Sequence, residues 1–196
     1  MSESIIKITI AGNAAVGKTS TLRRYVLDVF TEERNSTIGA SFVFKKIELN
    51  DQVIRLNLWD TAGQEKYYAL VPMYYRNTNC LLLVYDITNK KSFMDVKDKW
   101  YKDLNKHLDL NSVVIGLIGN KSDMEDERQV TKKEALDFAK DKNLIFQEVS
   151  AKTNDNIDTF FSNIIEKTLE MFENNPELIN TPFSIKNNSN QKSCCY

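Results

Sequence analysis

The segment Gly12–Thr19 constrains the fold of this chain more strongly than any other part of the sequence. It reads GNAAVGKT, follows the apolar run Ile5–Ala11 and opens a helical pattern at about Gly17–Val29. The match to G-x-x-x-x-G-K-[ST] between a strand and a helix predicts a loop whose N–H groups surround phosphate oxygens, aided by the helix dipole. A chance glycine turn is the alternative. Lys18 is expected to reach the β- and γ-phosphates, and Thr19 to offer its hydroxyl to Mg²⁺.

Apolar runs alternate with helical patterns along the rest of the chain. The expected strands are Ile5–Ala11, Ser41–Asn50, Gln52–Asp60, Leu81–Asp86, Val113–Gly119 and Leu144–Ser150. The pair Asn50-Asp51 predicts a hairpin between the second and third strands. Helical spacing recurs at Phe93–Leu104, after Thr131 and at Ile157–Leu169. The order β-α-β-β-α-β-α-β-α-β-α predicts an α/β fold of the P-loop NTPase type, with a six-stranded, mostly parallel sheet, one antiparallel edge strand and helices on both faces.

The length of 196 residues suits one compact domain with a short tail. We expect the domain over residues 1–173 and a flexible tail over 174–196, where Asn, Ser, Lys and Pro dominate and helical periodicity ends. The content of 42% apolar and 27% charged residues is that of a soluble globular protein. The net charge of −1 gives no reason to expect a nucleic-acid partner.

The cysteines provide no disulfide framework and no zinc spacing. Cys80 begins an apolar run, whereas Cys194 and Cys195 stand at the C-terminus, a distribution that fits a reducing compartment. The N-terminus lacks the pattern of a signal peptide, and the longest apolar runs, Cys80–Tyr85 and Val113–Ile118, are too short to span a bilayer. Membrane contact is therefore expected only through a covalent lipid or a partner.

A second motif, Asp60–Glu65, stands at the end of a predicted strand and reads DTAGQE. There the Asp60 carboxylate is suited to hold a metal-bound water, the Gly63 N–H to approach the γ-phosphate, and Gln64 to orient an attacking water. Thr37, between the first helix and the second strand, is placed to offer a hydroxyl to Mg²⁺ and the γ-phosphate. The alternatives are an N-capping aspartate in a turn and an ordinary loop threonine.

A third motif, Asn120–Asp123, reads NKSD and directly follows a predicted buried strand. The Asp123 carboxylate can accept two hydrogen bonds from the N1–H and 2-amino groups of guanine. Adenine lacks this pair of donors, and a site built for a hydrogen-bonding partner strongly rejects an analogue without it. Asn120 is expected to brace the loop and the Lys121 stem to cover the base. A plain polar loop is the alternative.

The fourth motif, Ser150–Lys152, follows the last predicted strand. The Ala151 N–H is expected to meet the guanine O6, although the segment also suits a simple approach to a helix. Phe30, at the end of the first helix, is expected to pack edge-on against the base or, alternatively, to lie in the core.

Together these motifs resemble the Ras superfamily of small GTPases over Ile5–Phe172. Three segments resemble the Rab branch: Ile38–Phe42, Tyr74–Arg76 and Leu83–Thr88. The stretches Thr37–Phe42 and Ala69–Tyr75 look most like the early-endosomal Rabs. The resemblance implies a monomeric GTP/GDP switch with slow intrinsic hydrolysis. In the GTP state it would recruit effectors for vesicular traffic, at the cytoplasmic face of endosomal membranes and in exchange with the cytosol.

The resemblance also implies roles for individual residues. Catalysis would depend on Gln64, Lys18 and Gly63, and the Mg²⁺ ligands would be Thr19, Thr37 and Asp60. The residues implied to contact the nucleotide are Asn13, Ala14, Ala15, Val16, Gly17, Lys18, Thr19, Ser20, Phe30, Thr37, Gly63, Asn120, Lys121, Asp123, Ser150, Ala151 and Lys152. An exposed aromatic triad read by effectors would consist of Phe42, Trp59 and Tyr74. Packing of these three side chains in the core is the alternative. The two switch segments would span about Phe30–Ser41 and Ala62–Met73.

The implied partners are a nucleotide exchange factor, a GTPase-activating protein, a GDP dissociation inhibitor, an escort protein and effectors. Ser193 occupies the cysteine position of a C-a-a-X box, so the terminal Cys194-Cys195 pair instead resembles a double-geranylgeranylation signal. Two lipid chains make membrane anchoring stable, whereas one is marginal. Two unmodified terminal thiols are the alternative.

Two residues of the phosphate loop depart from the pattern of the family. Ala15 stands where Rabs commonly carry glycine, and Ala14 where Ras also carries one. A methyl group there is expected to leave nucleotide binding intact and to affect intrinsic hydrolysis. The competing hypotheses are another phosphate-loop NTPase and a GTP-binding scaffold that does not cycle.

Overall fold

The computed structural model describes residues 4–32, 37, 39–49, 52–63 and 71–179. Its strands form one sheet in the order β2-β3-β1-β4-β5-β6. They are β1 (Ser4–Ala11), β2 (Ala40–Leu49), β3 (Gln52–Thr61), β4 (Cys80–Asp86), β5 (Val114–Asn120) and β6 (Ile145–Glu148). Only β2 and β3 pair antiparallel, and every other neighbouring pair is parallel. The predicted fold class is therefore confirmed.

The last strand is shorter than the sequence predicted, because the expected strand continued to Ser150. The backbone still bonds to the neighbouring strand at Val149, whose N–H donates to the Gly119 carbonyl at 2.9 Å. Ser150 then forms an isolated bridge with Asp155 instead of extending the sheet. The chain thus turns away at the carboxyl edge, where the fourth motif begins. The predicted Asn50-Asp51 turn lies outside the described residues, and the flanking Leu49 and Gln52 pair in register.

The helices are α1 (Lys18–Leu27), α2 (Val71–Tyr75), α3 (Lys90–Asp95), α4 (Tyr101–His107), α5 (Lys132–Asp141) and α6 (Ile157–Asn174). A π-helical turn, η2 (Val96–Trp100), joins α3 to α4, so the predicted helical stretch is continuous but not a regular α-helix. Short 3₁₀ turns are η3 (Leu110–Ser112), η4 (Glu125–Glu127) and η5 (Pro176–Ile179). Thr131 caps the start of α5, since the Glu134 N–H donates to Thr131 Oγ1 at 3.2 Å.

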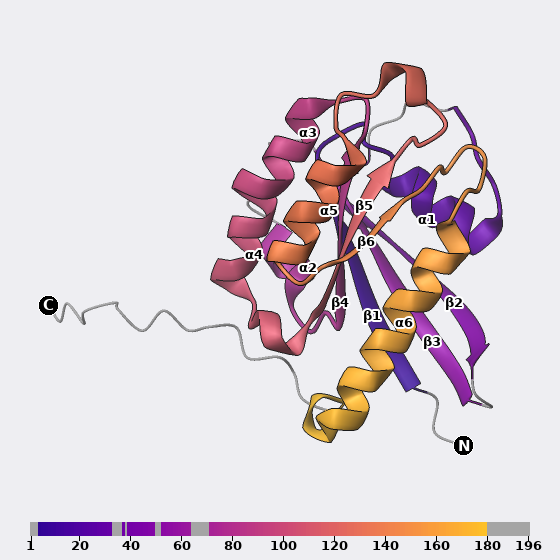
Figure 1. Ribbon diagram of the computed structural model, residues 1–196. Coiled ribbons are helices and arrows are strands. Elements are labelled where there is room, and N and C mark those ends of the chain that lie inside the picture. Colours follow the sequence, from indigo (N-terminus) through magenta and orange to yellow (C-terminus); the bar gives the residue numbers. More distant parts are fainter. Residues whose placement is uncertain (1–3, 33–36, 38, 50–51, 64–70, 180–196) are drawn as a thin grey trace, which may run out of the picture.

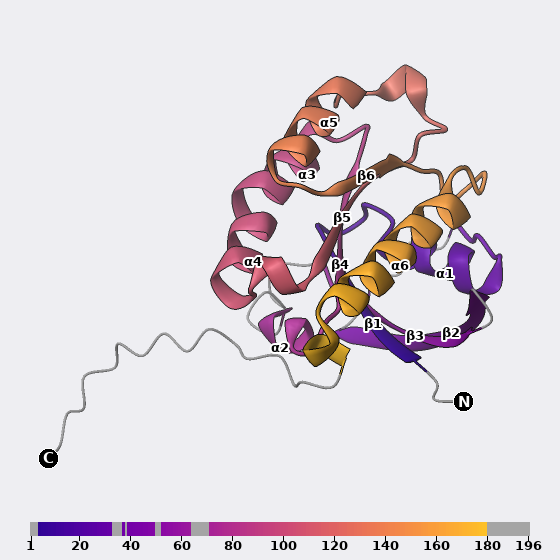
Figure 2. The ribbon, with the colours of Figure 1, turned by 60° about the horizontal axis from the view of Figure 1, so that its bottom comes forward.

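Helices cover both faces of the sheet, with α1 and α6 on one face and α2 to α5 on the other (Figures 1 and 2). On the first face, the rings of Tyr25 and Phe161 stack at a centroid distance of 3.8 Å. On the second, Tyr85, Phe93 and Trp100 are fully buried. Burying one such side chain stabilises the fold by about 1.5–3 kcal/mol. The two cores hold the central strands in place, and with them the loops at their carboxyl ends.

The alternation of apolar and polar residues in Gln52–Asp60 does not by itself determine which side chains of β3 face the core. In the structure Ile54, Leu56 and Leu58 point into the core shared with α1 and α6. Trp59 has the opposite parity, so it lies on the outer face of the strand.

The described chain continues past the domain boundary expected at residue 173. Helix α6 includes Asn174, and Leu178 of η5 packs against the core of the first face. Residues 180–196 of the predicted tail lie outside the described residues. Within the described ranges, no helix combines the length and apolar character needed to cross a membrane.

Candidate nucleotide-binding site

The phosphate loop connects β1 to α1, and its two glycines are required by close approaches of the backbone. Gly12 has φ 144° and Gly17 has φ 92°. A β-carbon on Gly12 would overlap the Val84 carbonyl oxygen, and one on Gly17 would overlap Asn120 Nδ2. No side chain caps the start of α1 at Gly17. The helix N-terminus is therefore available to an anion, as the sequence motif predicted.

Ala15 shows that this loop is under backbone strain. Its φ of 63° lies in the left-handed region, which costs an L-residue roughly 1–2 kcal/mol. Glycine has no such cost, which accounts for the usual preference for glycine at such a position. Ala14 and Ala15 are both exposed at the mouth of the loop.

Lys18 is buried, and its ammonium group lies inside the loop. Nζ donates to the carbonyl oxygens of Gly12 and Asn13 at 2.8 and 2.7 Å. Burial lowers the pKa of Lys18 to about 8, and the negative charge of Asp60 opposes this shift. Phosphate oxygens placed in the loop would favour the charged ammonium form. The group is thus positioned to meet phosphate.

Three oxygen-bearing side chains predicted to bind Mg²⁺ meet beside Lys18. The Thr19 hydroxyl donates to Asp60 Oδ2 at 2.5 Å, and it lies 3.0 Å from Thr37 Oγ1. Asp60 Oδ1 is buried and has no hydrogen-bond partner among the described residues. Burial raises the pKa of Asp60, whereas the bonds to Thr19 and the charge of Lys18 lower it. A buried carboxylate oxygen without a partner, next to two hydroxyls, fits a hard cation such as Mg²⁺.

Gly63 places the start of the second switch segment directly on the phosphate loop. A β-carbon on Gly63 would overlap the Asn13 carbonyl carbon, the Ala14 nitrogen and Lys18 Nζ. The Gly63 backbone therefore lies where its N–H was expected to reach a γ-phosphate. Gln64, predicted to orient water, lies outside the described residues.

Asn120 connects the phosphate loop to the loops predicted to recognise the base. Its Nδ2 donates to the Val16 carbonyl at 2.9 Å, and its Oδ1 accepts from the Ala151 N–H at 3.2 Å. The Ser150 hydroxyl donates to Asp123 Oδ1 at 2.5 Å, which orients an exposed carboxylate. Because the Ala151 N–H already bonds to Asn120, its expected bond to guanine O6 would have to share this donor.

Lys121 is oriented by a carboxylate that sequence reasoning did not assign to the site. Its φ is 68°, and its ammonium group forms an ion pair with Asp86 Oδ2. Asp86 also accepts hydrogen bonds from the Thr88 N–H and hydroxyl at 2.8 and 2.7 Å. Asp86 ends β4, one strand away from the motif that carries Lys121, so no sequence spacing indicated the pair.

The three remaining residues predicted to contact the nucleotide are Phe30, Ser20 and Lys152. Phe30 follows α1, is half-buried and belongs to neither core cluster, so the core alternative is not supported. Ser20 lies in the first turn of α1, and Lys152 is exposed beside the base loops.

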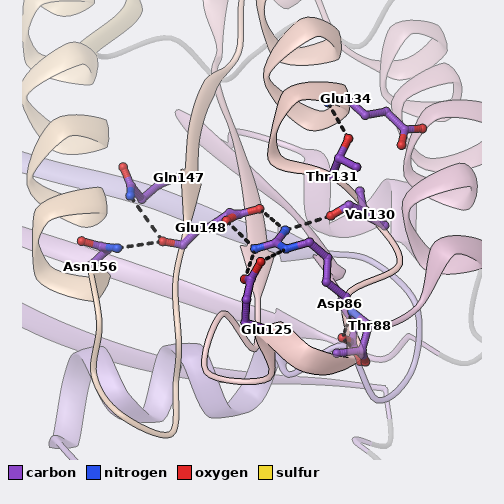
Figure 3. Close-up of polar contacts among 10 residues, drawn as sticks. Asp86, Thr88, Glu125, Val130, Thr131, Glu134, Gln147, Glu148 and Asn156 are labelled. Carbon is purple, nitrogen blue, oxygen red and sulfur yellow. Dashed lines mark hydrogen bonds and ion pairs between the residues drawn. The ribbon is translucent and has the colours of Figure 1, made fainter.

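The Arg128 guanidinium connects the two loops predicted to hold the base, and the sequence analysis did not predict this role. Arg128 donates from Nε and Nη2 to Glu125 at 2.8 and 2.6 Å, and from Nη1 and Nη2 to Glu148 at 2.7 and 3.0 Å. Nη1 also donates to the Val130 carbonyl at 2.8 Å. We refer to Glu125, Arg128, Val130 and Glu148 as the arginine bracket. Figure 3 shows the two glutamates and Val130 converging on one guanidinium.

The arginine bracket joins the ends of two loops that are distant in sequence. Glu125 follows the third motif by two residues, and Glu148 precedes Ser150 by two. The Glu148 carbonyl also accepts from Asn156 Nδ2 at 3.0 Å (Figure 3), which ties in the start of α6. The two carboxylates raise the pKa of Arg128, so its guanidinium stays charged. The bracket therefore holds the two base loops at a constant separation.

A phosphate loop beside three oxygen-bearing side chains suited to Mg²⁺, at the carboxyl edge of this sheet, is the arrangement of a P-loop domain that binds nucleoside triphosphates. The comparison with protein families specifies the class further, since the model of the Ras family matches residues 7–170. The chain belongs to the Ras family. Members of this family are small GTPase switches that bind GTP and GDP, generally with Mg²⁺, and hydrolyse GTP. They generally work with exchange factors, activating proteins and effectors. A phosphate-loop NTPase of another class is thereby excluded.

The arginine bracket predicts a specific effect of Glu148→Gln on nucleotide release. The neutral amide keeps the side-chain shape but weakens the charge-assisted bonds to Arg128, so the loops predicted to hold the base are supported less firmly. We expect the release of a fluorescent GDP analogue to accelerate about tenfold. Glu127→Gln is the matched control, because Glu127 is exposed on the same turn η4 and lies outside the bracket. Equal release rates in the two variants would contradict the bracket.

Proposed function

We propose that this chain is a Rab-type GTPase that recruits effectors in its GTP state and regulates vesicular traffic at endosomal membranes. Family membership accounts for the switch in general, and the Rab assignment goes further. It is supported by three aromatic side chains that the sequence assigned to effector binding.

These residues, Phe42, Trp59 and Tyr74, form one surface cluster. Phe42 and Trp59 are register partners on β2 and β3, and their ring centroids lie 5.2 Å apart. Trp59 and Tyr74 lie 5.9 Å apart. Phe42 is 46% exposed, and Trp59 and Tyr74 are half-buried. The alternative, that all three lie in the core, does not hold for Phe42, and the cluster offers an aromatic surface of the kind favoured at interfaces.

The switch would depend on Thr37 and Gly63, which lie on either side of the phosphate loop. Thr37 Oγ1 lies 3.5 Å from Asp60 Oδ2, within reach of the predicted Mg²⁺ site. Gly63 lies against Asn13 and Lys18. A γ-phosphate and its Mg²⁺ would be held by both segments, and hydrolysis would remove this common anchor.

Asp123 carries the proposed guanine selectivity. In Asp123→Asn the amide oxygen can still accept from the N1–H, but the amide N–H opposes the 2-amino group of guanine, whereas it can donate to the C2 oxygen of xanthine. We expect GDP affinity to fall by about 10²-fold or more and the preference to move toward xanthosine diphosphate, as measured by competition binding. Asp126→Asn, an exposed aspartate outside the motif, is the matched control. Unaltered GDP affinity in Asp123→Asn would overturn this role.

Gln64 carries the proposed water-orienting role. In Gln64→Leu the attacking water loses the side chain that orients it. We therefore expect single-turnover GTP hydrolysis with an activating protein to slow at least about tenfold. The exposed Gln52 provides a matched control in Gln52→Leu. A chain that hydrolyses no GTP before any substitution would instead support the alternative of a scaffold that does not cycle.

The proposed membrane attachment depends on Cys194 and Cys195, which lie outside the described residues. Two geranylgeranyl groups would be added with an escort protein, and a GDP dissociation inhibitor would return the chain to the cytosol. We expect intact-mass measurement of the native protein to show two isoprenoid additions, and the Cys194→Ser, Cys195→Ser double variant to lose its endosomal location. Cys80→Ser is the control, because Cys80 is fully buried and its pKa is raised by burial. A native mass without isoprenoid would refute the anchor.

A further inference from the structure

Asn13, the second residue of the phosphate loop, has both ends of its side-chain amide held by the helical segment α3–η2. Nδ2 donates to Asp95 Oδ2 at 2.7 Å, and Oδ1 accepts from Trp100 Nε1 at 2.8 Å. A carboxylate can only accept and an indole N–H can only donate, so the amide has one possible orientation. Lys99 Nζ pairs with the other oxygen of Asp95 at 2.7 Å and holds that carboxylate.

The π-helical turn brings these two partners to one side of the helix. Asp95 is the last residue of α3 and Trp100 the last of η2, five positions later. Five steps of 100° in an α-helix would separate the two side chains by about 140° around the axis. In η2 the Tyr101 N–H bonds instead to the Val96 carbonyl, a spacing of five residues that widens the turn and brings positions five apart closer in direction. The local distortion thereby creates a clamp for Asn13.

The clamp acts on the part of the loop that faces the expected γ-phosphate. The Asn13 carbonyl oxygen accepts from Lys18 Nζ, and the Asn13–Ala14 peptide contacts Gly63. Ala15, two residues on, has the strained positive φ described above. A strained conformation persists only where its surroundings determine it strongly. Trp100 is fully buried and the Asp95 side chain is 13% exposed, so the clamp lies mostly within the packed interior.

We propose that Asn13 is a positioning residue for GTP hydrolysis, and that the clamp formed by Asp95 and Trp100 holds the Asn13–Ala15 backbone against Gly63 and Lys18. The clamp acts through backbone position, and its own groups do not touch the reacting atoms. Base recognition is made by loops at the other end of the site, so release of the clamp should affect hydrolysis more than nucleotide retention. This inference rests on GTP hydrolysis by the chain, and not on its assignment to the Rab branch.

Two variants test the clamp from opposite sides. Asn13→Ala removes both hydrogen bonds, and Trp100→Phe removes the indole donor while keeping an aromatic ring in the core. We expect each to slow single-turnover GTP hydrolysis about tenfold and to change GDP release less than about twofold. The double variant should be no slower than Asn13→Ala, because Asn13→Ala already removes the hydrogen bond that Trp100→Phe would break. Asp98→Asn is the matched control and should keep near-normal hydrolysis, because Asp98 is exposed on η2 and lies outside the clamp.

A spectroscopic measurement separates the clamp from its catalytic effect. The chain contains two tryptophans, so Trp59→Phe leaves Trp100 as the sole indole emitter. In that background, Asn13→Ala should shift the Trp100 emission, because Nε1 loses its acceptor in the loop.

The outcomes distinguish the inference from the activity on which it rests. Normal hydrolysis in Asn13→Ala, or equal changes in hydrolysis and GDP release, would overturn the positioning role. An unshifted Trp100 emission would overturn the clamp itself. If the unsubstituted chain hydrolysed no GTP while the emission still shifted, GTP hydrolysis and the positioning role would both fail and the clamp alone would stand.

Discussion

The Asn120 amide is the contact on which the arrangement of the site depends, because it joins the phosphate loop to the loops predicted to meet the base. It donates to Val16 in the phosphate loop and accepts from Ala151 in the last loop. Gly17 allows this approach, since any side chain there would displace the amide. Each loop continues from a buried strand, and the strands cannot shift relative to one another without breaking the sheet. The distance between phosphate and base recognition is therefore set by the sheet and maintained by one side chain.

The charged groups beside the phosphate loop are arranged for ligands of opposite charge. Lys18 and Asp60 are both buried, and burial moves the pKa of each toward its neutral form. Burying a charge is unfavourable unless it is paired, so the local arrangement is more favourable with phosphate and Mg²⁺ than without them. A ligand that binds only the folded state also stabilises it. Nucleotide binding and folding stability are accordingly coupled in this domain.

Two groups of side chains outside the motifs position the loops of the predicted nucleotide site. The arginine bracket holds the base loops, and the clamp on Asn13 holds the phosphate loop. In both cases a side chain of the site, or its neighbour, is oriented by groups from a helix or turn that carries no recognisable motif. Asp86 acts in the same way on Lys121. The geometry of the residues in the motifs thus depends on partners elsewhere in the chain.

The sequence by itself determined the elements and the chemistry. Local apolar patterns predicted the six strands in their order along the chain. Four short motifs predicted the phosphate loop, the oxygen ligands and the base loops. Such signals are readable because the chemistry requires certain residues at fixed short spacings. The tertiary structure alone decided that Trp59 faces outward, that Arg128 meets Glu148, and that a π-helical turn brings Asp95 and Trp100 together. These outcomes follow from packing between segments far apart in the chain, and no spacing along the sequence records which distant side chains a folded sheet brings into contact.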